Sequence, residues 1–411
     1  MVEAVDGERM AREAAELSFP RYPGTEGDVR AVAWVAERLR EAGLEVRVED
    51  FSYDLRPVWW ALRGMLIGCG LAVGAAGLLA PDRPGLAALL LLALAPGAVF
   101  LAWAPWLERL YRRAGPTATA NVVGRRAAAG PPRLTLLLLA HHDSKSQNLT
   151  FPARMGLTLA ALGGTVGLAA YLAPSLSAGL PVGPTAWPRA SGLAAALALL
   201  ALSAIRNGNR SPGGVDNAGS VAVLLHLARR LPGELPPEVE LIFLSPGAEE
   251  DHMVGAMRWL DANREDLAGR PVWAFNFDGA GAPGRLVLLE RYGFGRPFSP
   301  ALSRLARQVA AAMGERVRGV LMPPAMGIDA IPFAHRGIDC LTLSSGSLGP
   351  AVWAVHSAGD RPELLDPSTL ARVAGLAEGM ARALAGVPPH PNPLPPLGGE
   401  GVRTPEAGQR R

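Results

Sequence analysis

The hydrophobic pattern divides this chain into segments with strand or helix spacing and segments that are apolar throughout. Residues 28–44 repeat apolar positions at helical spacing, and residues 44–51 then alternate as a half-buried strand does. Further along, short apolar runs predict strands at residues 134–140, 239–245, 272–277, 286–290 and 341–344. Between and after them, helices are predicted at residues 217–231, 253–263, 302–313 and 367–384. Continuous apolar strands between helices predict an α/β fold with a largely parallel sheet covered on both faces.

Two pairs of long apolar segments interrupt this alternation. The first pair covers residues 58–80 and 85–104, separated by Pro81-Asp82-Arg83-Pro84, and the second covers residues 155–173 and 192–205. Because about 20 apolar residues are needed to cross a bilayer, we predict two inserted transmembrane helical hairpins. Tryptophans at the ends of the first pair are typical of a membrane interface: Trp59, Trp60, Trp103 and Trp106. Buried core helices remain the alternative, above all for the short segment 192–205.

These patterns predict one interrupted domain rather than two. Its three parts are residues 1–57, 107–150 and 207–385, the hairpins are residues 58–106 and 151–206, and the Pro- and Gly-rich residues 386–411 form a tail predicted to be disordered. Strands of one sheet precede and follow each hairpin in the sequence. Each hairpin must therefore cross the membrane an even number of times. Arginines gather beside the domain, whereas the hairpin tips carry chiefly Arg83 and Arg189. This bias predicts that the domain lies on the cytoplasmic side of the membrane, which we expect to be a bacterial inner membrane. Residues 1–28 show no cleavable signal.

Composition adds restrictions on function. The chain has 411 residues, of which 49% are hydrophobic and only 19% charged, which is apolar for a soluble protein. Its net charge is +3 and Lys145 is its single lysine, so nucleic acid is not an expected partner. Cys69 and Cys340 lie in apolar surroundings, and they support neither a disulfide framework nor a cysteine zinc site. The sequence does not indicate an oligomeric state.

Chemistry begins where the apolar strand at residues 134–140 runs into His141-His142-Asp143-Ser144. Ligands in α/β sheets gather at the carboxyl ends of strands, so His141 is a candidate metal ligand. Asp143 suits a carboxylate that fixes the tautomer of a bound imidazole. His142 points the other way on extended backbone. We interpret it as a polar wall residue, with a role as the ligand in place of His141 left open.

Five further residues occupy comparable settings. Asp216 opens a predicted helix after Gly213-Gly214-Val215, where an N-cap is the ordinary interpretation and a carboxylate shared by two cations the functional one. Glu249 and Glu250 follow the strand 241–244, and Asp278 follows the strand 274–277. In such a pair of acids, one carboxylate ligates a metal while its neighbour takes a proton from the attacking water. His356 follows the apolar segment 351–355 and completes the set.

The ordered set resembles the co-catalytic di-zinc aminopeptidase family, which also includes glutamate carboxypeptidase relatives. The family's His-x-Asp, Asp-Asn-Ala-Ser-Gly, Gly-Ala-Glu-Glu, Asn-x-Asp, Asp-x-x-Pro-Phe and His-Thr-x-x-Asp motifs are similar to residues 141–143, 216–220, 247–250, 276–278, 329–333 and 356–360. The departures are Gly219-Ser220 in inverted order, His142 where Tyr is usual, and Asp251-His252 after the paired acids. The resemblance implies a three-layer sandwich with a mixed central sheet.

The resemblance also implies roles. Asp216 would bridge two ions, with His141 and Asp278 holding one ion and Glu250 and His356 holding the other. Glu249 would be the general base. We count Asp143 with Glu249 as a catalytic residue. Zn²⁺ suits such ligands, although other divalent ions are compatible with them. The implied reaction is hydrolysis of the amide bond of a peptide or small amide.

Three functions therefore compete at the level of sequence. The leading interpretation is a membrane-anchored aminopeptidase whose partners are its substrate and the lipid bilayer. The second is a hydrolase of the same chemistry that acts on N-acyl amino acids, carboxy-terminal residues or lipid-like amides. The third is a non-catalytic receptor or binding module, which the retention of all six residues argues against. Substrate specificity has no spacing code and is not predicted.

Overall fold

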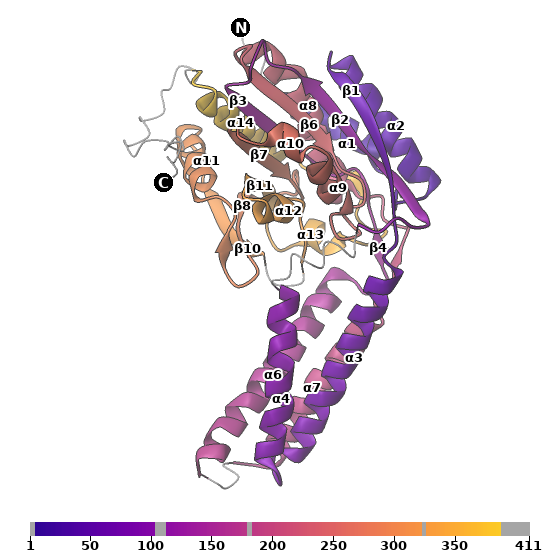
Figure 1. Cartoon of the computed structure of the whole chain (residues 1–411), viewed down its shortest axis with the longest axis vertical. Helices are drawn as coiled ribbons and strands as arrows, with labels where there is room; N and C mark the ends of the chain where they lie inside the picture. The colour runs from indigo at the N-terminus through magenta and orange to yellow at the C-terminus, as the bar shows by residue number, and fades with distance from the viewer. Residues whose placement is uncertain (1–4, 103–111, 179–182, 323–325, 388–411) are drawn as a thin grey trace, which may run out of the picture.

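The computed structural model describes residues 5–102, 112–178, 183–322 and 326–387. Trp103, Trp106, Arg109 and most of the predicted tail lie outside these residues. Within them, a layered α/β domain sits at one end of a long helical bundle (Figure 1).

The domain is built around one mixed sheet with the strand order β1-β2-β6-β3-β7-β11-β8-β10, to which β9 adds by pairing with β8. The strands are β1 (Glu45–Tyr53), β2 (Thr117–Arg126), β3 (Leu134–Leu139), β6 (Val239–Ser245), β7 (Val272–Phe277), β8 (Arg285–Tyr292), β9 (Arg296–Pro297), β10 (Val317–Met322) and β11 (Asp339–Gly346). The four central strands β6, β3, β7 and β11 are parallel, and antiparallel pairs lie toward both edges. The predicted fold class is confirmed, and β2 and β10 are strands that the pattern did not predict.

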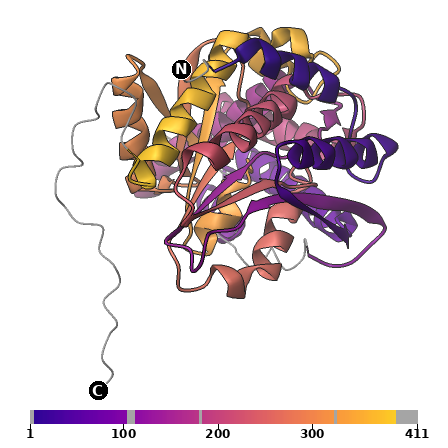
Figure 2. The same ribbon diagram turned by 90° about the horizontal axis from the view of Figure 1, so that it is seen from above.

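Helices cover both faces of this sheet (Figure 2). One face packs against α1 (Gly7–Leu17), α2 (Glu26–Glu41), α8 (Gly219–Glu234), α11 (Pro300–Ala312) and α14 (Pro367–Leu384), and the other against α9 (Val254–Ala262), α10 (Arg264–Leu267) and α12 (Ala330–His335). Strand β3 shows why its sequence is apolar throughout. Leu136 and Leu138 belong to the first core, whereas Leu137 and Leu139 belong to the second.

Side-chain caps fix where the surface helices begin. Thr25 accepts a hydrogen bond from the Asp28 amide at the start of α2. Asp366 accepts from the amides of Ser368 and Thr369 at the start of α14, and Pro367 occupies its first turn, where a missing N–H costs nothing. These caps satisfy amides that have no partner within the helix.

Two inserted hairpins form the bundle: α3 (Arg56–Leu79) with α4 (Pro84–Ala102), and α6 (Phe151–Ala178) with α7 (Ala186–Ser203) (Figure 1). Each has a two-stranded stem at the domain. The first leaves β1 and returns to β2, which pair antiparallel from Glu45↔Arg125 to Tyr53↔Thr117. The second leaves β4 (Ser146–Gln147) and returns to β5 (Asn207–Gly208), which also pair. Both insertions are therefore excursions that start and end at the same place on the domain.

The bundle is apolar on its outside as well as inside. Its interior contains a small core of Val73, Ala76, Ala80, Ala87, Leu168, Tyr171, Leu172 and Ala195. Large apolar side chains also point outward, among them Leu71, Leu89 and Leu159, which are each at least 60% exposed. Three helices of the described chain are long and apolar enough to cross a membrane: Arg56–Leu79, Phe151–Ser177 and Ala186–Ser203. An outward apolar surface of this extent is typical of contact with lipid.

Small residues bring α3 and α7 into close contact, and this contact is testable. A Cβ added to Gly77 would lie 2.7 Å from the Pro188 carbonyl oxygen and 2.8 Å from the Gly192 Cα. We expect Gly77→Val to push the helices apart and to destabilise the bundle by about 1–3 kcal/mol, the usual cost of overpacking. Thermal unfolding of the full chain in detergent measures the effect.

Gly68→Val is the matched control, because it lies on the same helix and nothing lies within 4 Å of an added Cβ. Equal stability of the two variants would contradict the close crossing of α3 and α7.

Candidate metal centre

The carboxyl ends of three adjacent strands bring most of the predicted site residues to one edge of the sheet. His141 follows β3, Glu249 and Glu250 follow β6, and Asp278 follows β7. Asp216 lies in the helical turn η2 (Gly214–Ala218), which leads into α8, and His356 lies just after α13 (Pro350–Ala354). Residues far apart in the sequence meet here because parallel strands end at the same edge of a sheet.

The ligand atoms form two groups that share Asp216. His141, Asp216 and Asp278 make the first group, and Asp216, Glu250 and His356 make the second; within each group the ligand atoms lie within 4.8 Å of one another. Oδ1 of Asp216 is 3.3 Å from Nε2 of His141, and Oδ2 is 3.1 Å from Nε2 of His356. One carboxylate therefore turns an oxygen to each group, which is the geometry that a bridging ligand requires.

The hydrogen bonding of the His141 ring is compatible with binding of a metal ion. Its Nδ1 lies 3.2 Å from the Asp143 carbonyl oxygen, so the ring proton belongs on Nδ1 and the Nε2 lone pair faces Asp216. Nε2 is buried and has no hydrogen-bond partner among the described residues. An orphaned buried nitrogen among carboxylates is explained by a cation, and imidazole with carboxylate oxygens is a donor set that zinc accepts.

Two carboxylates position the ligands without belonging to either group. Asp143 accepts hydrogen bonds from the amides of Glu249 and Glu250, at 3.2 and 3.1 Å, and so fixes the turn that carries both glutamates. Asp360 accepts from the amides of Val215 and Asp216, at 2.7 and 3.3 Å. Burial raises the pKa of Asp360 to about 7, and the nearby charge of Asp216 acts in the same direction.

Glu249 lies in the centre but outside both groups of ligand atoms. Its Oε2 is 3.8 Å from Nε2 of His141. Burial raises the pKa of Glu249 well above its ordinary value; His141 opposes this shift, while Asp329 and Asp278 add to it. A carboxylate beside the ligands with a raised pKa is suited to taking up and releasing a proton.

Two of the three departures from the family's pattern, His142 and Asp251-His252, have identifiable contacts. His142 is buried with Nδ1 3.1 Å from the Ser245 hydroxyl oxygen, away from both ligand groups. Asp251 accepts hydrogen bonds of 2.7 Å from the hydroxyls of Tyr22 and Tyr53. The His252 ring lies 5.7 Å from that of Trp59 on α3, so it links the site to the first hairpin. Burial, followed by the charge of Lys145, lowers the pKa of His252 to about 4.

Sequence reasoning missed several charged residues at this site. Arg21 is wholly buried and donates to the carbonyls of Phe19, His142, Pro212 and Gly213, which joins the first residues of the domain to two loops of the centre. Asp329 precedes α12 at the N-cap position, but neither of its buried carboxylate oxygens has a hydrogen-bond partner in the described chain. Burial raises the pKa of Asp329 to about 8.

Two further cations complete the list of missed residues. The Lys145 ammonium lies 2.8 Å from Oε2 of Glu250, and Nη2 of Arg154, on the first turn of α6, lies 2.9 Å from Nδ1 of His356. The Asp-x-x-Pro-Phe motif was a signal for Asp329. Arg21, Lys145 and Arg154 have no comparable motif, because only the fold places them beside the ligands.

Comparison with known proteins identifies one family that matches most of the chain in sequence. The sequence profile of Peptidase family M28 matches residues 121–380, which is more than half of the chain. No curated protein sequence matches the chain.

Solved structures share the fold at low sequence identity. An aminopeptidase from Aneurinibacillus sp. strain AM-1 has a TM-score of 0.57 and 15% identity, with 96% of this chain and 97% of that one covered. A zinc aminopeptidase from Bacillus subtilis has a TM-score of 0.54 and 13% identity, with 92% and 95% covered. A glutaminyl cyclase from an Acidobacteriales bacterium has a TM-score of 0.55 and 13% identity, with 93% and 96% covered. The fold therefore accommodates more than one reaction.

The second ligand group predicts a specific loss of metal. We expect His356→Ala to lower the zinc content at saturating zinc without abolishing it, because His141, Asp216 and Asp278 remain. Elemental analysis of the purified full chain measures the loss, and His335→Ala, on α12, is the matched control. Full retention of zinc by His356→Ala would exclude His356 as a ligand.

Proposed function

The chain belongs to peptidase family M28 and is a zinc metallopeptidase, and we propose that it is a membrane-anchored aminopeptidase with two metal positions. The observation that carries this proposal is the pair of ligand groups that share Asp216, with Glu249 beside them and in neither. Such an arrangement supports hydrolysis of a peptide bond by an activated water. A non-catalytic receptor module would not need a carboxylate such as Glu249 beside the metal ligands.

The ligands would be His141 and Asp278 at one position, Glu250 and His356 at the other, and Asp216 at both. When bound, the divalent cations supply Lewis-acid polarisation of the scissile carbonyl and a more acidic water. Glu249 accepts the proton of the attacking water and passes it to the leaving amine. Asp143 holds Glu249 in place through the hydrogen bond of 3.2 Å from its amide.

The apolar bundle supports anchoring in a membrane. Each hairpin returns to its starting point, so the domain lies wholly on one side, and arginines beside the domain favour the cytoplasmic side of a bacterial inner membrane. The surroundings of Arg63 place the membrane interface near the domain end of α3. Arg63 donates to the Ile205 carbonyl at 3.3 Å and lies 6.0 Å from the Trp60 ring. Charged and aromatic groups of this kind are typical of the interface.

A second candidate is a hydrolase of lipid-like or N-acyl amides. The contact of Arg154 with His356 favours it, because it places the first turn of the apolar helix α6 beside the centre. A substrate with an apolar tail would then reach the scissile bond from the bilayer.

A substrate comparison separates these functions. We expect the full chain in detergent to release the first residue of a peptide with a free amino terminus and to leave the acetylated peptide intact. A chelator should abolish the release, and added zinc should restore it. Faster cleavage of the blocked amide would support the second candidate, and loss of ammonia from an amino-terminal glutamine would indicate cyclase chemistry instead.

The proton-transfer role of Glu249 has its own test. We expect Glu249→Gln to lower kcat by about 10²–10⁴, the usual range for a lost general base, with the zinc content unchanged. Steady-state kinetics and elemental analysis on one preparation measure both quantities. Glu37→Gln, at an exposed position on α2, is the control. Activity of Glu249→Gln within a few-fold of the parent would rule out this role.

A further inference from the structure

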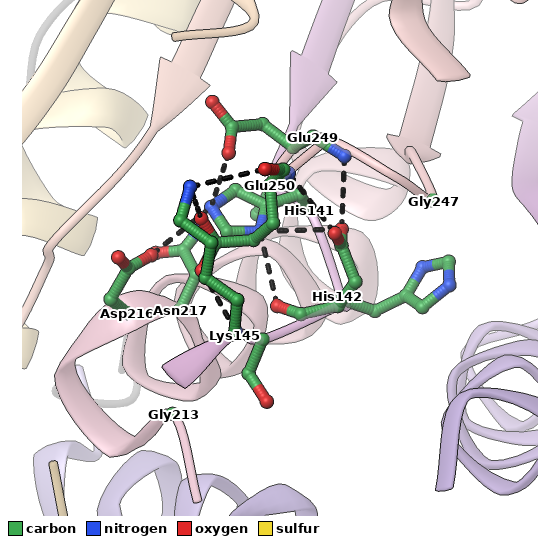
Figure 3. A network of polar contacts seen from close by, with 12 residues as sticks. His141, His142, Lys145, Gly213, Asp216, Asn217, Gly247, Glu249 and Glu250 are labelled. Carbon is green, nitrogen blue, oxygen red and sulfur yellow. Dashed lines mark hydrogen bonds and ion pairs between the residues drawn. The ribbon is translucent and has the colours of Figure 1, made fainter. Parts of the chain in front are cut away.

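Two cations of the chain itself lie at the second ligand group. The Lys145 ammonium is 2.8 Å from Oε2 of Glu250 and donates to the Glu250 carbonyl oxygen at 3.1 Å. Nη2 of Arg154 is 2.9 Å from Nδ1 of His356. Figure 3 shows Lys145 reaching in among Asp216, Glu249 and Glu250. Oε2 of Glu250 is also the oxygen that lies 3.1 Å from Nε2 of His356, so the ammonium contacts a ligand atom of the metal position.

The first ligand group has different surroundings. The groups that face His141 are the carboxylates of Asp143, Asp216 and Glu249, at 3.5, 3.3 and 3.8 Å. A divalent cation there is attracted by every one of these neighbours. At the second group, the Lys145 ammonium lies 2.8 Å from the ligand oxygen Oε2 of Glu250, so a cation held by that oxygen would be repelled by a nearby positive charge in a buried site.

The hydrogen bonds of the two histidines differ in the same direction. Nδ1 of His141 faces the Asp143 carbonyl, an acceptor, so its Nε2 lone pair is available for a metal. A guanidinium has no acceptor, so Nδ1 of His356 must accept from Arg154 and the ring proton lies on Nε2. Nε2 is the atom directed at Asp216 and Glu250. A metal at the second position therefore requires Arg154 to move and the ring proton to shift.

From these contacts we infer that the two metal positions are unequal: the His141–Asp216–Asp278 position holds the resident ion, and the Asp216–Glu250–His356 position is an exchangeable cation site for which Lys145 competes. The inference rests on the proposed zinc centre but not on the bond that is cleaved. At low free zinc, the ammonium partly replaces the second ion as the counter-charge of Glu250. At higher free zinc, the ion displaces it. Lys145 thereby makes the occupancy of the centre depend on the supply of metal.

Stepwise metal binding tests this inference. The full chain in detergent is stripped of metal and then equilibrated with buffered free Zn²⁺ over a wide range, and bound zinc is counted by elemental analysis. We expect one ion to bind first and the second to require at least about 100-fold more free zinc. Two ions of equal affinity in the parent chain would overturn the inference, whatever the variants do.

Variants identify the cause of the difference. Lys145→Met should tighten the second step by at least about 10-fold and leave the first unchanged, whereas Lys145→Arg, which keeps the charge, should retain a weak second step. Arg154→Met should give a smaller tightening of the same step. The first step serves as the internal control for folding. An unchanged second step in Lys145→Met would also overturn the inference.

Failure of the proposed function gives a different result. If no peptide is hydrolysed but zinc still binds in two unequal steps, the aminopeptidase proposal fails and the unequal positions stand. If hydrolysis is zinc-dependent but both ions bind alike, the reverse holds.

Discussion

The site depends on one constraint, which is that buried carboxylates need positive charge. Asp143, Glu249, Glu250 and Asp329 are buried, and Asp216 and Asp278 lie beside them. So many acids in a low-dielectric interior repel one another unless cations or protons intervene. Lys145 and Arg21 supply part of the charge, and the orphaned Nε2 of His141 indicates that a further cation belongs there. Metal binding is thus a direct way to balance a charge distribution that the fold creates.

The sheet is the reason that these groups can converge. Strands β6, β3 and β7 are buried on both faces, so only their ends can carry polar side chains without cost, and the parallel arrangement directs these ends to one edge. The stems of the two hairpins allow a membrane bundle to be inserted without disturbing that arrangement. Because β4 and β5 close the second hairpin, α6 begins close enough to the centre for Arg154 to contact His356.

The sequence predicted the elements that have a regular apolar pattern and the residues that lie in ordered motifs. Residues 239–245 and 272–277 are strands with the predicted bounds, since continuous apolar runs between helices have few other interpretations. The three layers follow from the resemblance to a known family, and the convergence of the six site residues follows from its ordered motifs, four of whose residues lie at strand ends. Strand β2, with the polar residues Thr117, Thr119 and Asn121, has no such run and was missed. Lys145 and Arg154 could not be predicted either, because their significance lies in contacts across the fold with Glu250 and His356.

Locating the metal tests the central claim most directly. Anomalous scattering at the zinc absorption edge, from crystals of the full chain grown with zinc, gives the position of each bound ion. The account predicts a peak in contact with Asp216, between His141 and Asp278. Bound zinc with no peak in contact with Asp216 would contradict it.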